Sequence, residues 1–255
     1  MKIDKKKISD SFSKSAESYD RHAVLQRTMG EKLIDRLNGD FQKILDIGSG
    51  TGLLSQLLLE HGNTVLAIEP NDEMRAAAER RLNRHPGFRS LRATAEDTTL
   101  PDDSVDCVCA GQALHWFDLP RARAEFARIL KPGGFCFFVW NWRNPSRSAL
   151  IRDLEDLLHR FSPEYADLKM PDEIESDVAA FFDPGGFRRC CLTIAQDLDF
   201  AGLRGRVLSC SFMPLPGEPD YAPLLPELRD LFDRHQQAGR VRLEYETLLY
   251  YGRLI

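Results

Sequence analysis

Residues 43–70 constrain the fold most, because two short apolar runs in this segment are joined through a glycine-rich turn. The runs, at 43–47 and 64–68, have the length and composition of buried strands. Between them, the sequence Gly-Ser-Gly-Thr-Gly at 48–52 allows a sharp turn and leaves no β-carbon to keep a ligand away. An apolar helical stretch follows at 53–59. Strand, glycine turn, helix and strand predict half of a nucleotide-binding α/β unit, whose ligands lie outside the carboxyl ends of the strands.

Two carboxylates accompany this turn. Asp46 lies in the first apolar run, and Glu69 ends the second run directly before Pro70. A carboxylate only accepts hydrogen bonds and can take two hydroxyl donors at once, as a ribose offers. The turn and the two acids together indicate a site for a nucleoside-containing cofactor rather than an ordinary tight turn.

Two classes of ligand fit such a unit. A dinucleotide fingerprint has the spacing G-x-G-x-x-G, in which the last glycine lets the helix pack closely on the strand. Leu53 stands where that last glycine is expected, and the third glycine, Gly52, comes one residue early. This spacing weakens the case for an NAD-dependent oxidoreductase, which stays open as the alternative function.

The spacing Asp46-x-Gly48-x-Gly50-x-Gly52 resembles the glycine-rich motif of class I S-adenosylmethionine-dependent methyltransferases, in particular the methyltransferase type 11 group. The resemblance implies an α/β fold with a Rossmann-like sheet of seven strands, mostly parallel with an antiparallel last strand. Helices would cover both faces, and a helical cap would lie above. The loop would pass beside the methionine part of S-adenosylmethionine, and Glu69 would accept both ribose hydroxyls.

Further segments resemble the cofactor contacts of the same family. Met74 would lie under the adenine ring, and the third strand leads into Thr94-Ala95-Glu96 at the adenine edge. Thr94 departs from the aspartate usual there, so Glu96 has a second interpretation as a supporting or capping residue. The cofactor-binding residues expected from the resemblance are Tyr19, Asp46, Gly48, Ser49, Gly50, Glu69, Pro70, Met74, Thr94, Ala95, Glu96 and Gln112.

The octet at 111–118, Gly-Gln-Ala-Leu-His-Trp-Phe-Asp, follows the predicted fourth strand. Because a central strand ends there, the octet is expected next to the reacting groups. The resemblance places Gln112 at the methionine end of the cofactor, and His115 and Trp116 at the wall of the substrate site. A histidine that only packs or caps a helix is the simpler interpretation of His115, and general-base catalysis is the bolder one.

The N-terminal residues 8–37 predict two helices by their apolar spacing. The pattern Phe12-x-x-x-Ala16-x-x-Tyr19 is similar to the leading segment of many of these methyltransferases, where a tyrosine covers the cofactor. The continuation at 22–27 resembles the malonyl-carrier-protein O-methyltransferases of biotin synthesis. This resemblance makes Arg27 a candidate to hold a carboxylate.

The residues after 140 are interpreted as two insertions and a final pair of strands. The whole chain, 1–255, is expected to be a single methyltransferase domain with an N-terminal helical cover at 1–38 and substrate-cap insertions at 141–186 and 201–237. The segment 204–214 resembles the trans-aconitate group of small-molecule methyltransferases. The two ends of the chain therefore indicate different substrates.

Both resemblances favour a small molecule with a carboxylate acceptor, either alone or attached to a carrier protein. A carboxylate is already ionised at neutral pH and needs a counter-ion rather than a base. A guanidinium matches a carboxylate in two-pronged geometry, so the candidate counter-ions are Arg143, Arg147, Arg204 and Arg206. Of these, Arg143 and Arg206 are predicted as substrate-binding residues. If the acceptor is a phenol, alcohol or amine, His115 becomes the first base to test. S-adenosylhomocysteine is the expected product, and a non-catalytic cofactor-binding protein is a further alternative.

Composition excludes several other classes. A formal net charge of −5 argues against a nucleic-acid-binding surface as the main feature. No apolar run approaches the ~20 residues needed to span a bilayer, so neither a membrane span nor a secretory signal is expected. The six cysteines lack paired metal-ligand spacing, which predicts buried thiols in a reducing cytoplasm and no metal site. The sequence does not decide the oligomeric state.

Overall fold

The computed structural model describes residues 41–162, 165, 171–210, 212–214 and 216–254. The predicted N-terminal helices, with Tyr19 and Arg27, lie outside the described residues. The chain divides into a larger unit, made of 26–141, 169–192 and 247–255, and a smaller unit, made of 1–25, 142–168 and 193–246. Almost every predicted site residue after residue 40 belongs to the larger unit; Arg143 and Arg206 belong to the smaller one.

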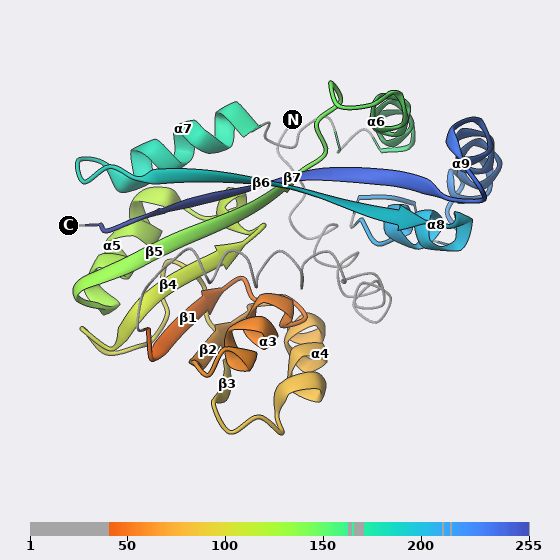
Figure 1. Ribbon diagram of the computed structural model, residues 1–255. Coiled ribbons are helices and arrows are strands. Elements are labelled where there is room, and N and C mark those ends of the chain that lie inside the picture. Colours follow the sequence, from red (N-terminus) through yellow and green to blue (C-terminus); the bar gives the residue numbers. More distant parts are fainter. Residues whose placement is uncertain (1–40, 163–164, 166–170, 211, 215, 255) are drawn as a thin grey trace. The chain divides into compact units, whose positions relative to one another are not determined.

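The strands form a mostly parallel sheet in the order β3-β2-β1-β4-β5-β7-β6, with an antiparallel edge (Figure 1). This arrangement confirms the predicted fold class. The strands are β1 (Lys43–Ile47), β2 (Thr64–Ile68), β3 (Phe88–Leu91), β4 (Val105–Gly111), β5 (Leu130–Trp142), β6 (Arg188–Leu198) and β7 (Val241–Gly252).

The register of the parallel strands determines where the predicted site residues lie. Asp46 of β1 pairs with Ala67 of β2 on one side and with Cys109 of β4 on the other. Because the strands run in the same direction, the turns that follow β1, β2 and β4 leave the sheet at the same edge. This is the edge at which ligands bind in open α/β sheets.

The helices begin where the sequence supplies a cap. Asn71 caps α4, since its side chain accepts hydrogen bonds from the amides of Glu73 and Met74. Asp118 and Ser148 cap α5 and α6 in the same way. The helices are α3 (Leu53–Glu60), α4 (Asp72–Leu82), α5 (Leu119–Ile129), α6 (Ala149–Phe161), α7 (Pro171–Phe182), α8 (Phe200–Leu208) and α9 (Tyr221–His235), with a 3₁₀ turn η2 (Leu114–Trp116).

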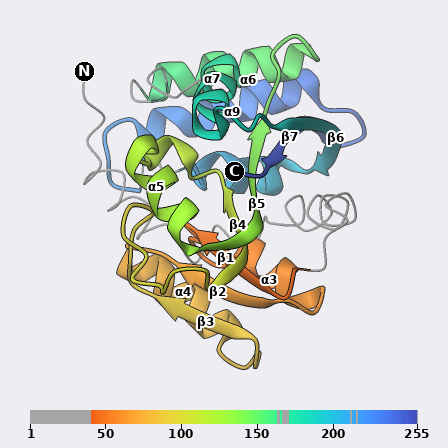
Figure 2. The ribbon, with the colours of Figure 1, turned by 90° about the vertical axis from the view of Figure 1, so that its left-hand side faces the viewer.

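Helices cover both faces of the sheet in the larger unit. Successive strand residues point to opposite faces, so Leu45 and Ile44 join different clusters. Leu45 packs in the cluster that holds Phe126 of α5 and Val178 of α7. Ile44 packs in the other cluster, with residues of α3 and α4 such as Leu58. Figure 2 shows α5 and α3 on opposite sides of β1 and β4.

The structure differs from the sequence-based expectation in three places. The proline and two glycines of the Lys-Pro-Gly-Gly segment at 131–134 predict a turn before a fifth strand at 135–140, but β5 already begins at Leu130. Along β5 the paired residues advance from Leu130 to Phe135, whereas along β4 they advance only from Val105 to Cys107. The extra residues of β5, which include both glycines, therefore form a bulge within the strand. Helix α7, expected within the 141–186 insertion, packs in the larger unit's core instead. Cys107, Cys109 and Cys136 are buried as expected, whereas Cys191 is exposed.

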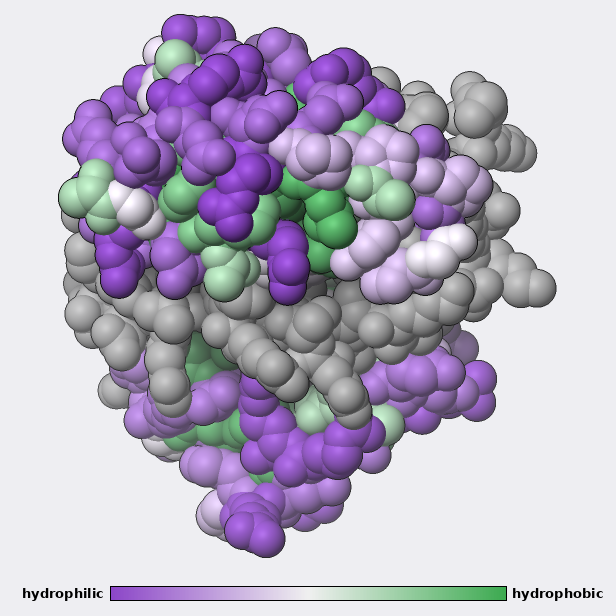
Figure 3. Space-filling model, turned by 90° about the vertical axis from the view of Figure 1, so that its right-hand side faces the viewer, coloured by the Kyte–Doolittle hydropathy of each residue, from purple (hydrophilic) through white to green (hydrophobic). Residues whose placement is uncertain are grey.

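The smaller unit contains α6, α8 and α9, and α9 contacts both of the other two helices. Leu154, Leu203 and Leu228 are each buried, one from each helix. From the side on which Figure 1 places α8 and α9, apolar residues lie in a hollow with hydrophilic residues above it (Figure 3). Among the described residues, none of the helices is both long and apolar enough to span a membrane.

Candidate functional site

The glycine turn is fastened to the end of β2. The amides of Gly48 and Ser49 both donate to the carbonyl oxygen of Ile68, at 2.9 and 3.0 Å. Gly50 has a φ of 55°, in the left-handed region, and a β-carbon added there would meet no atom within 4 Å. The turn therefore presents bare backbone to open space at the carboxyl edge of the sheet, as a close-fitting ligand requires.

Glu69 joins the glycine turn to the start of α4. Its Oε2 accepts a hydrogen bond from the Gly50 amide at 2.9 Å, and its Oε1 accepts one from the Asn71 amide at 2.8 Å. Burial raises the pKa of Glu69, while these two amides oppose the rise. A carboxylate has about four acceptor positions, so two remain for further donors such as ribose hydroxyls.

Asp46 lies beneath the turn and is buried, with 1% of its surface exposed. The Ser55 hydroxyl of α3 donates to Oδ2 at 2.6 Å, and the Cys109 thiol approaches Oδ1 at 3.9 Å. Burial raises the pKa of Asp46 to about 6, and the neighbouring charge of Glu69 adds to the rise. Asp46 thus supports the turn from within, and a direct contact with the cofactor stays a prediction.

The turn after β3 carries the three residues expected at the adenine edge. Thr94 is exposed and its amide donates to the carbonyl oxygen of Asp97 at 3.3 Å, while Ala95 is buried. The Glu96 Oε1 accepts a hydrogen bond from the Asp118 amide at 2.8 Å. This bond is consistent with the supporting role that the sequence offered as the second interpretation of Glu96, and a contact with the adenine edge stays a prediction.

Pro70 and Met74 flank the N-terminus of α4. Pro70 is exposed directly after Glu69, whereas Met74 is buried with 6% of its surface exposed. The Met74 amide donates to the capping oxygen of Asn71 at 3.0 Å. Their expected contacts with the adenosine part stay predictions.

Gln112 is held in an unusual backbone conformation at the end of β4. Its φ is 57°, its amide donates to the carbonyl oxygen of Val139 at 2.9 Å, and its side-chain amide donates to the carbonyl oxygen of Asn141 at 3.1 Å. A non-glycine residue with positive φ is uncommon and occurs often at functional sites. The conformation is consistent with the ligand-facing role predicted for Gln112.

His115 packs against two indole rings. Its ring centroid is 4.4 Å from that of Trp116 and 5.1 Å from that of Trp140, the latter in an edge-on arrangement. His115 is half-buried in η2, two residues after the buried Ala113. The histidine and the two tryptophans make an aromatic wall at the carboxyl ends of β4 and β5.

The two candidate arginines of the smaller unit differ in their surroundings. Arg143 donates to Glu155 Oε1 at 2.7 Å and to the Tyr165 hydroxyl at 2.9 Å. Burial alone would lower the pKa of Arg143, but Glu155, Tyr165, Tyr245 and Cys210 together outweigh burial and raise that pKa. Arg206 donates to the Tyr245 hydroxyl at 2.9 Å. Arg143 thus already has a carboxylate partner within its own unit.

The site fits a cationic nucleoside such as S-adenosylmethionine. Two buried carboxylates with raised pKa, Asp46 and Glu69, lie at the turn, and each would be stabilised by a nearby positive charge. Gly50 leaves room for the ligand itself. Within the described ranges, the His, Cys, Asp and Glu side chains form no group of three suited to a metal ion.

Several supporting residues escaped the sequence analysis. Ser55 contacts Asp46, and its place two residues into α3 could have suggested this role. Trp140 packs on His115 from another strand, and Glu125 anchors the turn after β3 from 27 residues away. Neither carries a local sequence signal.

Comparisons with known proteins agree with this geometry. Residues 45–138 match the model of a methyltransferase domain. An uncharacterized methyltransferase of Mycobacterium bovis is 41% identical over 119 residues, which cover 47% of this chain and 47% of that protein. A malonyl-[acyl-carrier protein] O-methyltransferase of Pectobacterium atrosepticum is 37% identical over 137 residues, 53% of each protein. The chain thus matches about half the length of these relatives.

Solved structures share the fold over most of the chain. A protein of Anaeromyxobacter dehalogenans assigned as a type II methyltransferase has a TM-score of 0.57 and 26% identity, covering 84% of this chain and 90% of that one. A geranyl diphosphate C-methyltransferase of Streptomyces coelicolor has a TM-score of 0.51 and 17% identity, covering 89% and 76%. With the glycine turn and Glu69 at the expected edge of the sheet, residues 45–138 match a methyltransferase domain, within a chain that shares the fold of solved methyltransferases.

Proposed function

We propose that the protein transfers a methyl group from S-adenosylmethionine to a carboxylate oxygen of a small molecule. One observation carries the cofactor part: the buried Glu69 carboxylate bridges the Gly50 amide and the cap of α4 with acceptor positions to spare. The acceptor part is supported by the relatives that are malonyl-[acyl-carrier protein] O-methyltransferases. By this likeness the acceptor is either a small acid alone or one attached to a carrier protein.

The proposed reaction needs little acid–base chemistry from the protein. The cofactor supplies a methyl group on a sulfonium, which leaves as the neutral thioether S-adenosylhomocysteine. The carboxylate oxygen gains the methyl group as the S–CH₃ bond breaks, so a neutral ester forms and no proton moves. The chain has to align the acceptor with the sulfonium, exclude water and balance charge. Alignment is the role proposed for the aromatic wall of His115, Trp116 and Trp140.

The candidate substrate residues have separate proposed roles. Trp116 and His115 would line the acceptor site, and Arg206 or Arg143 would pair with a carboxylate of the acceptor. Arg143 would have to share its charge with Glu155 to do so. His115 would act as a base only for a phenol, alcohol or amine acceptor.

A two-stage experiment tests the proposal. S-adenosylhomocysteine should raise the melting temperature of the purified protein, and NAD should not. A methylation assay should then give product with small carboxylic acids or their carrier-protein thioesters. Turnover of phenols or amines alone, abolished by His115→Asn, would replace the carboxylate acceptor with one that needs a base.

Two alternatives give distinct results in the same assays. A rise in melting temperature with NAD alone would favour the oxidoreductase. Tight S-adenosylhomocysteine binding with no turnover on any acceptor would favour a non-catalytic cofactor-binding protein. The methyltransferase-domain match at 45–138 supports the transferase over the oxidoreductase.

A further inference from the structure

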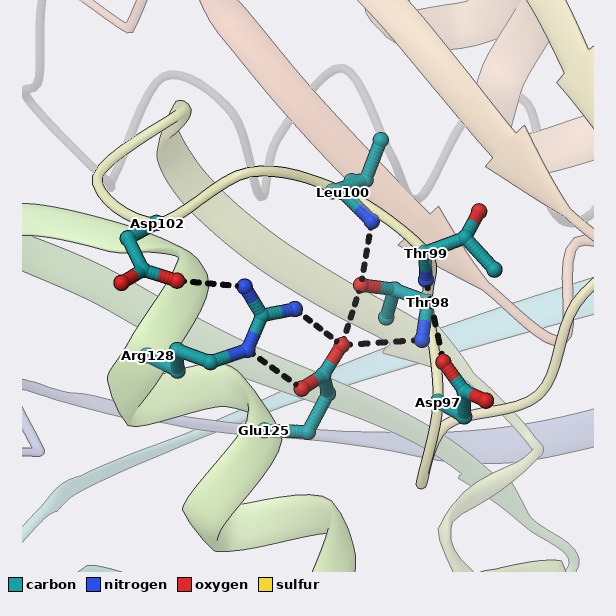
Figure 4. A network of polar contacts seen from close by, with 7 residues as sticks. All are labelled: Asp97, Thr98, Thr99, Leu100, Asp102, Glu125 and Arg128. Atoms are coloured by element: carbon teal, nitrogen blue, oxygen red, sulfur yellow. Dashed lines mark hydrogen bonds and ion pairs between the residues drawn. The ribbon is translucent and has the colours of Figure 1, made fainter.

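Helix α5 holds the turn after β3 by a network of polar contacts (Figure 4). The turn, residues 94–100, carries the exposed Thr94, which stands at the position expected to meet the adenine edge. Glu125 on α5 is the centre of the network, and it contacts the turn from the side of the helix. The arrangement raises the question of what this helix does for the turn.

A single oxygen of Glu125 holds Thr98. The Thr98 amide donates to Oε1 at 2.9 Å and the Thr98 hydroxyl donates to the same oxygen at 2.5 Å. The Leu100 amide then donates to the Thr98 hydroxyl oxygen at 3.3 Å. Thr98 is fully buried, so these bonds are shielded from competing water.

Arg128 in turn fixes Glu125, one turn further along the helix. Its Nε donates to Oε2 at 2.9 Å and its Nη2 to Oε1 at 2.7 Å, the bidentate geometry that holds a carboxylate in one orientation. Asp102 accepts from the third guanidinium nitrogen at 2.6 Å on the exposed side. Asp102 contacts the arginine and, unlike Glu125, accepts nothing from Thr98 in the bonds that Figure 4 marks.

The backbone held by this network has an unfavourable conformation at one residue. Thr99 has a φ of 60°, a left-handed conformation that is unfavourable for a β-branched residue. Its amide donates to Asp97 Oδ1 at 3.3 Å. Without an anchor at Thr98, the turn would gain conformations that do not present Thr94 and Ala95 in the same way.

The helix is also tied to the turn at its own N-terminus. Glu96 accepts from the amide of Asp118, and Asp118 follows directly on the His115–Phe117 segment. One helix therefore fastens the turn after β3 at two points, 118 and 125. These contacts couple the turn to the loop that carries the aromatic wall.

We propose that Glu125 is a positioning residue for cofactor binding, acting through Thr98 to hold the turn at 94–100 in the conformation that meets the adenosine part. The proposal rests on the proposed function, since it assumes S-adenosylmethionine at this edge of the sheet. Glu125 itself touches no cofactor in this account. Its contribution is to reduce the number of conformations that the turn must lose on binding.

Glu125→Gln tests the proposal with little change in shape. Glutamine has one acceptor oxygen and no charge, so its NH₂ group must face either the Nε of Arg128 or the donors of Thr98. In both orientations the charge-assisted bonds are lost and the turn loosens. S-adenosylhomocysteine should bind about tenfold more weakly by titration calorimetry, as expected when a charge-assisted bond is removed. The KM for S-adenosylmethionine should rise by a similar factor, while kcat at saturating cofactor stays within about twofold.

Matched variants separate positioning from general stability. Thr98→Val removes the hydroxyl at nearly constant volume and should weaken S-adenosylhomocysteine binding, whereas Thr98→Ser keeps the hydroxyl and should bind like wild type. Asp102→Asn removes a carboxylate from the same arginine on its exposed side and should leave the Kd unchanged.

The outcomes distinguish this proposal from the proposed function. Wild-type protein that fails to bind S-adenosylhomocysteine would remove both. Wild-type binding together with unchanged Kd in Glu125→Gln and Thr98→Val, measured well below their melting temperatures, would overturn the positioning role alone. A lower melting temperature with an unchanged Kd would likewise reduce Glu125 to a structural residue.

Discussion

Two carboxylate sites in the larger unit are built in opposite ways. Asp46, under the glycine turn, is buried and receives a hydroxyl and a thiol, and its pKa rises to about 6 because burial dominates. Glu125, on α5, receives a bidentate guanidinium and two donors from Thr98, and its pKa falls to about 2, chiefly because of Arg128. The two sites differ because the charge of Glu125 is balanced by Arg128 of the same chain, whereas no cation is among the groups of the described residues that act on Asp46.

Charge balance distinguishes a carboxylate at a ligand site, such as Asp46, from one that supports the fold, such as Glu125. A carboxylate whose charge is balanced by its own chain stabilises the fold and has little to offer a ligand. The groups that act on Asp46 in the described part of the chain are neutral donors and another acid, Glu69. A positive ligand near these two acids would relieve both, which is the electrostatic reason to expect a sulfonium there.

The largest expected effect concerns the pH dependence of stability at Asp46. Its pKa is higher in the folded state than the unfolded value of 3.8, so its stabilising contribution is complete below that value and is lost as the pH rises through about 6. Asp46→Asn cannot ionise. Between pH 3 and 8 the free energy of unfolding of the variant should therefore gain roughly 3 kcal/mol relative to wild type.

Urea unfolding of both proteins at several pH values measures this gain. Asp72→Asn is a suitable control, because Asp72 is an exposed acid whose pKa is lowered by its bond to Arg75. Parallel stability profiles for wild type and Asp46→Asn would mean that Asp46 is not the uncompensated acid described here.

Glu69→Gln should have the next largest effect, on cofactor affinity. The amide keeps one acceptor oxygen but cannot hold both the Gly50 amide and the ribose hydroxyls as the carboxylate would. The Kd for S-adenosylhomocysteine should rise about 30-fold, in the range for losing hydrogen bonds to a charged group. Titration calorimetry measures it, and an unchanged Kd would contradict the role of Glu69 in binding the sugar.

The positions of Asp46, Glu69 and the glycine turn were predictable from the sequence, but the hydrogen bonds that join them and Glu125 to other turns were not. Asp46, Glu69 and the glycine turn are local: strand periodicity and glycine spacing place them at one edge of the sheet. The hydrogen bond from Gly50 to Glu69 depends on how two turns meet, and the bond from Thr98 to Glu125 joins residues 27 apart. Such contacts leave no periodicity in the sequence, because they depend on packing between elements.

The bulge at 131–134 is a feature of the fold that the sequence also did not predict, because it depends on pairing with another strand. Pro132 and two glycines are typical of a turn, and the expectation of a turn followed from that chemistry. In the structure the segment lies within β5, since Leu130 already pairs with Val105 of β4. Pairing with a neighbouring strand overrode the local preference, as it often does for strand residues.

Glu125→Gln should show the opposite pH dependence to Asp46→Asn, with a smaller amplitude. The folded pKa of Glu125 lies below the usual value of 4.5, so its stabilisation is present above that value and is lost as the pH falls through about 2. The variant should be less stable than wild type at pH 7 by about 1 kcal/mol, because the partly exposed Arg128 is screened by solvent.

Acid titration of unfolding gives the measurement. The difference between wild type and Glu125→Gln should shrink below pH 4.5, while the difference for Asp46→Asn changes most between pH 4 and 6. If both stability differences changed in the same direction with pH, the distinction between the compensated carboxylate of Glu125 and the uncompensated one of Asp46 would be wrong.

The smallest expected effect lies at Thr94, on the same turn that Glu125 holds. Thr94 is exposed, and a carboxylate introduced there could accept a hydrogen bond from the exocyclic amine of adenine. Thr94→Asp should tighten S-adenosylhomocysteine binding about threefold, the scale of one exchanged hydrogen bond at an exposed position. S-inosylhomocysteine, which lacks that amine, should gain nothing. Equal gains for both ligands would mean that the added charge acts at a distance, and the turn would then contact another part of the nucleoside than the adenine edge.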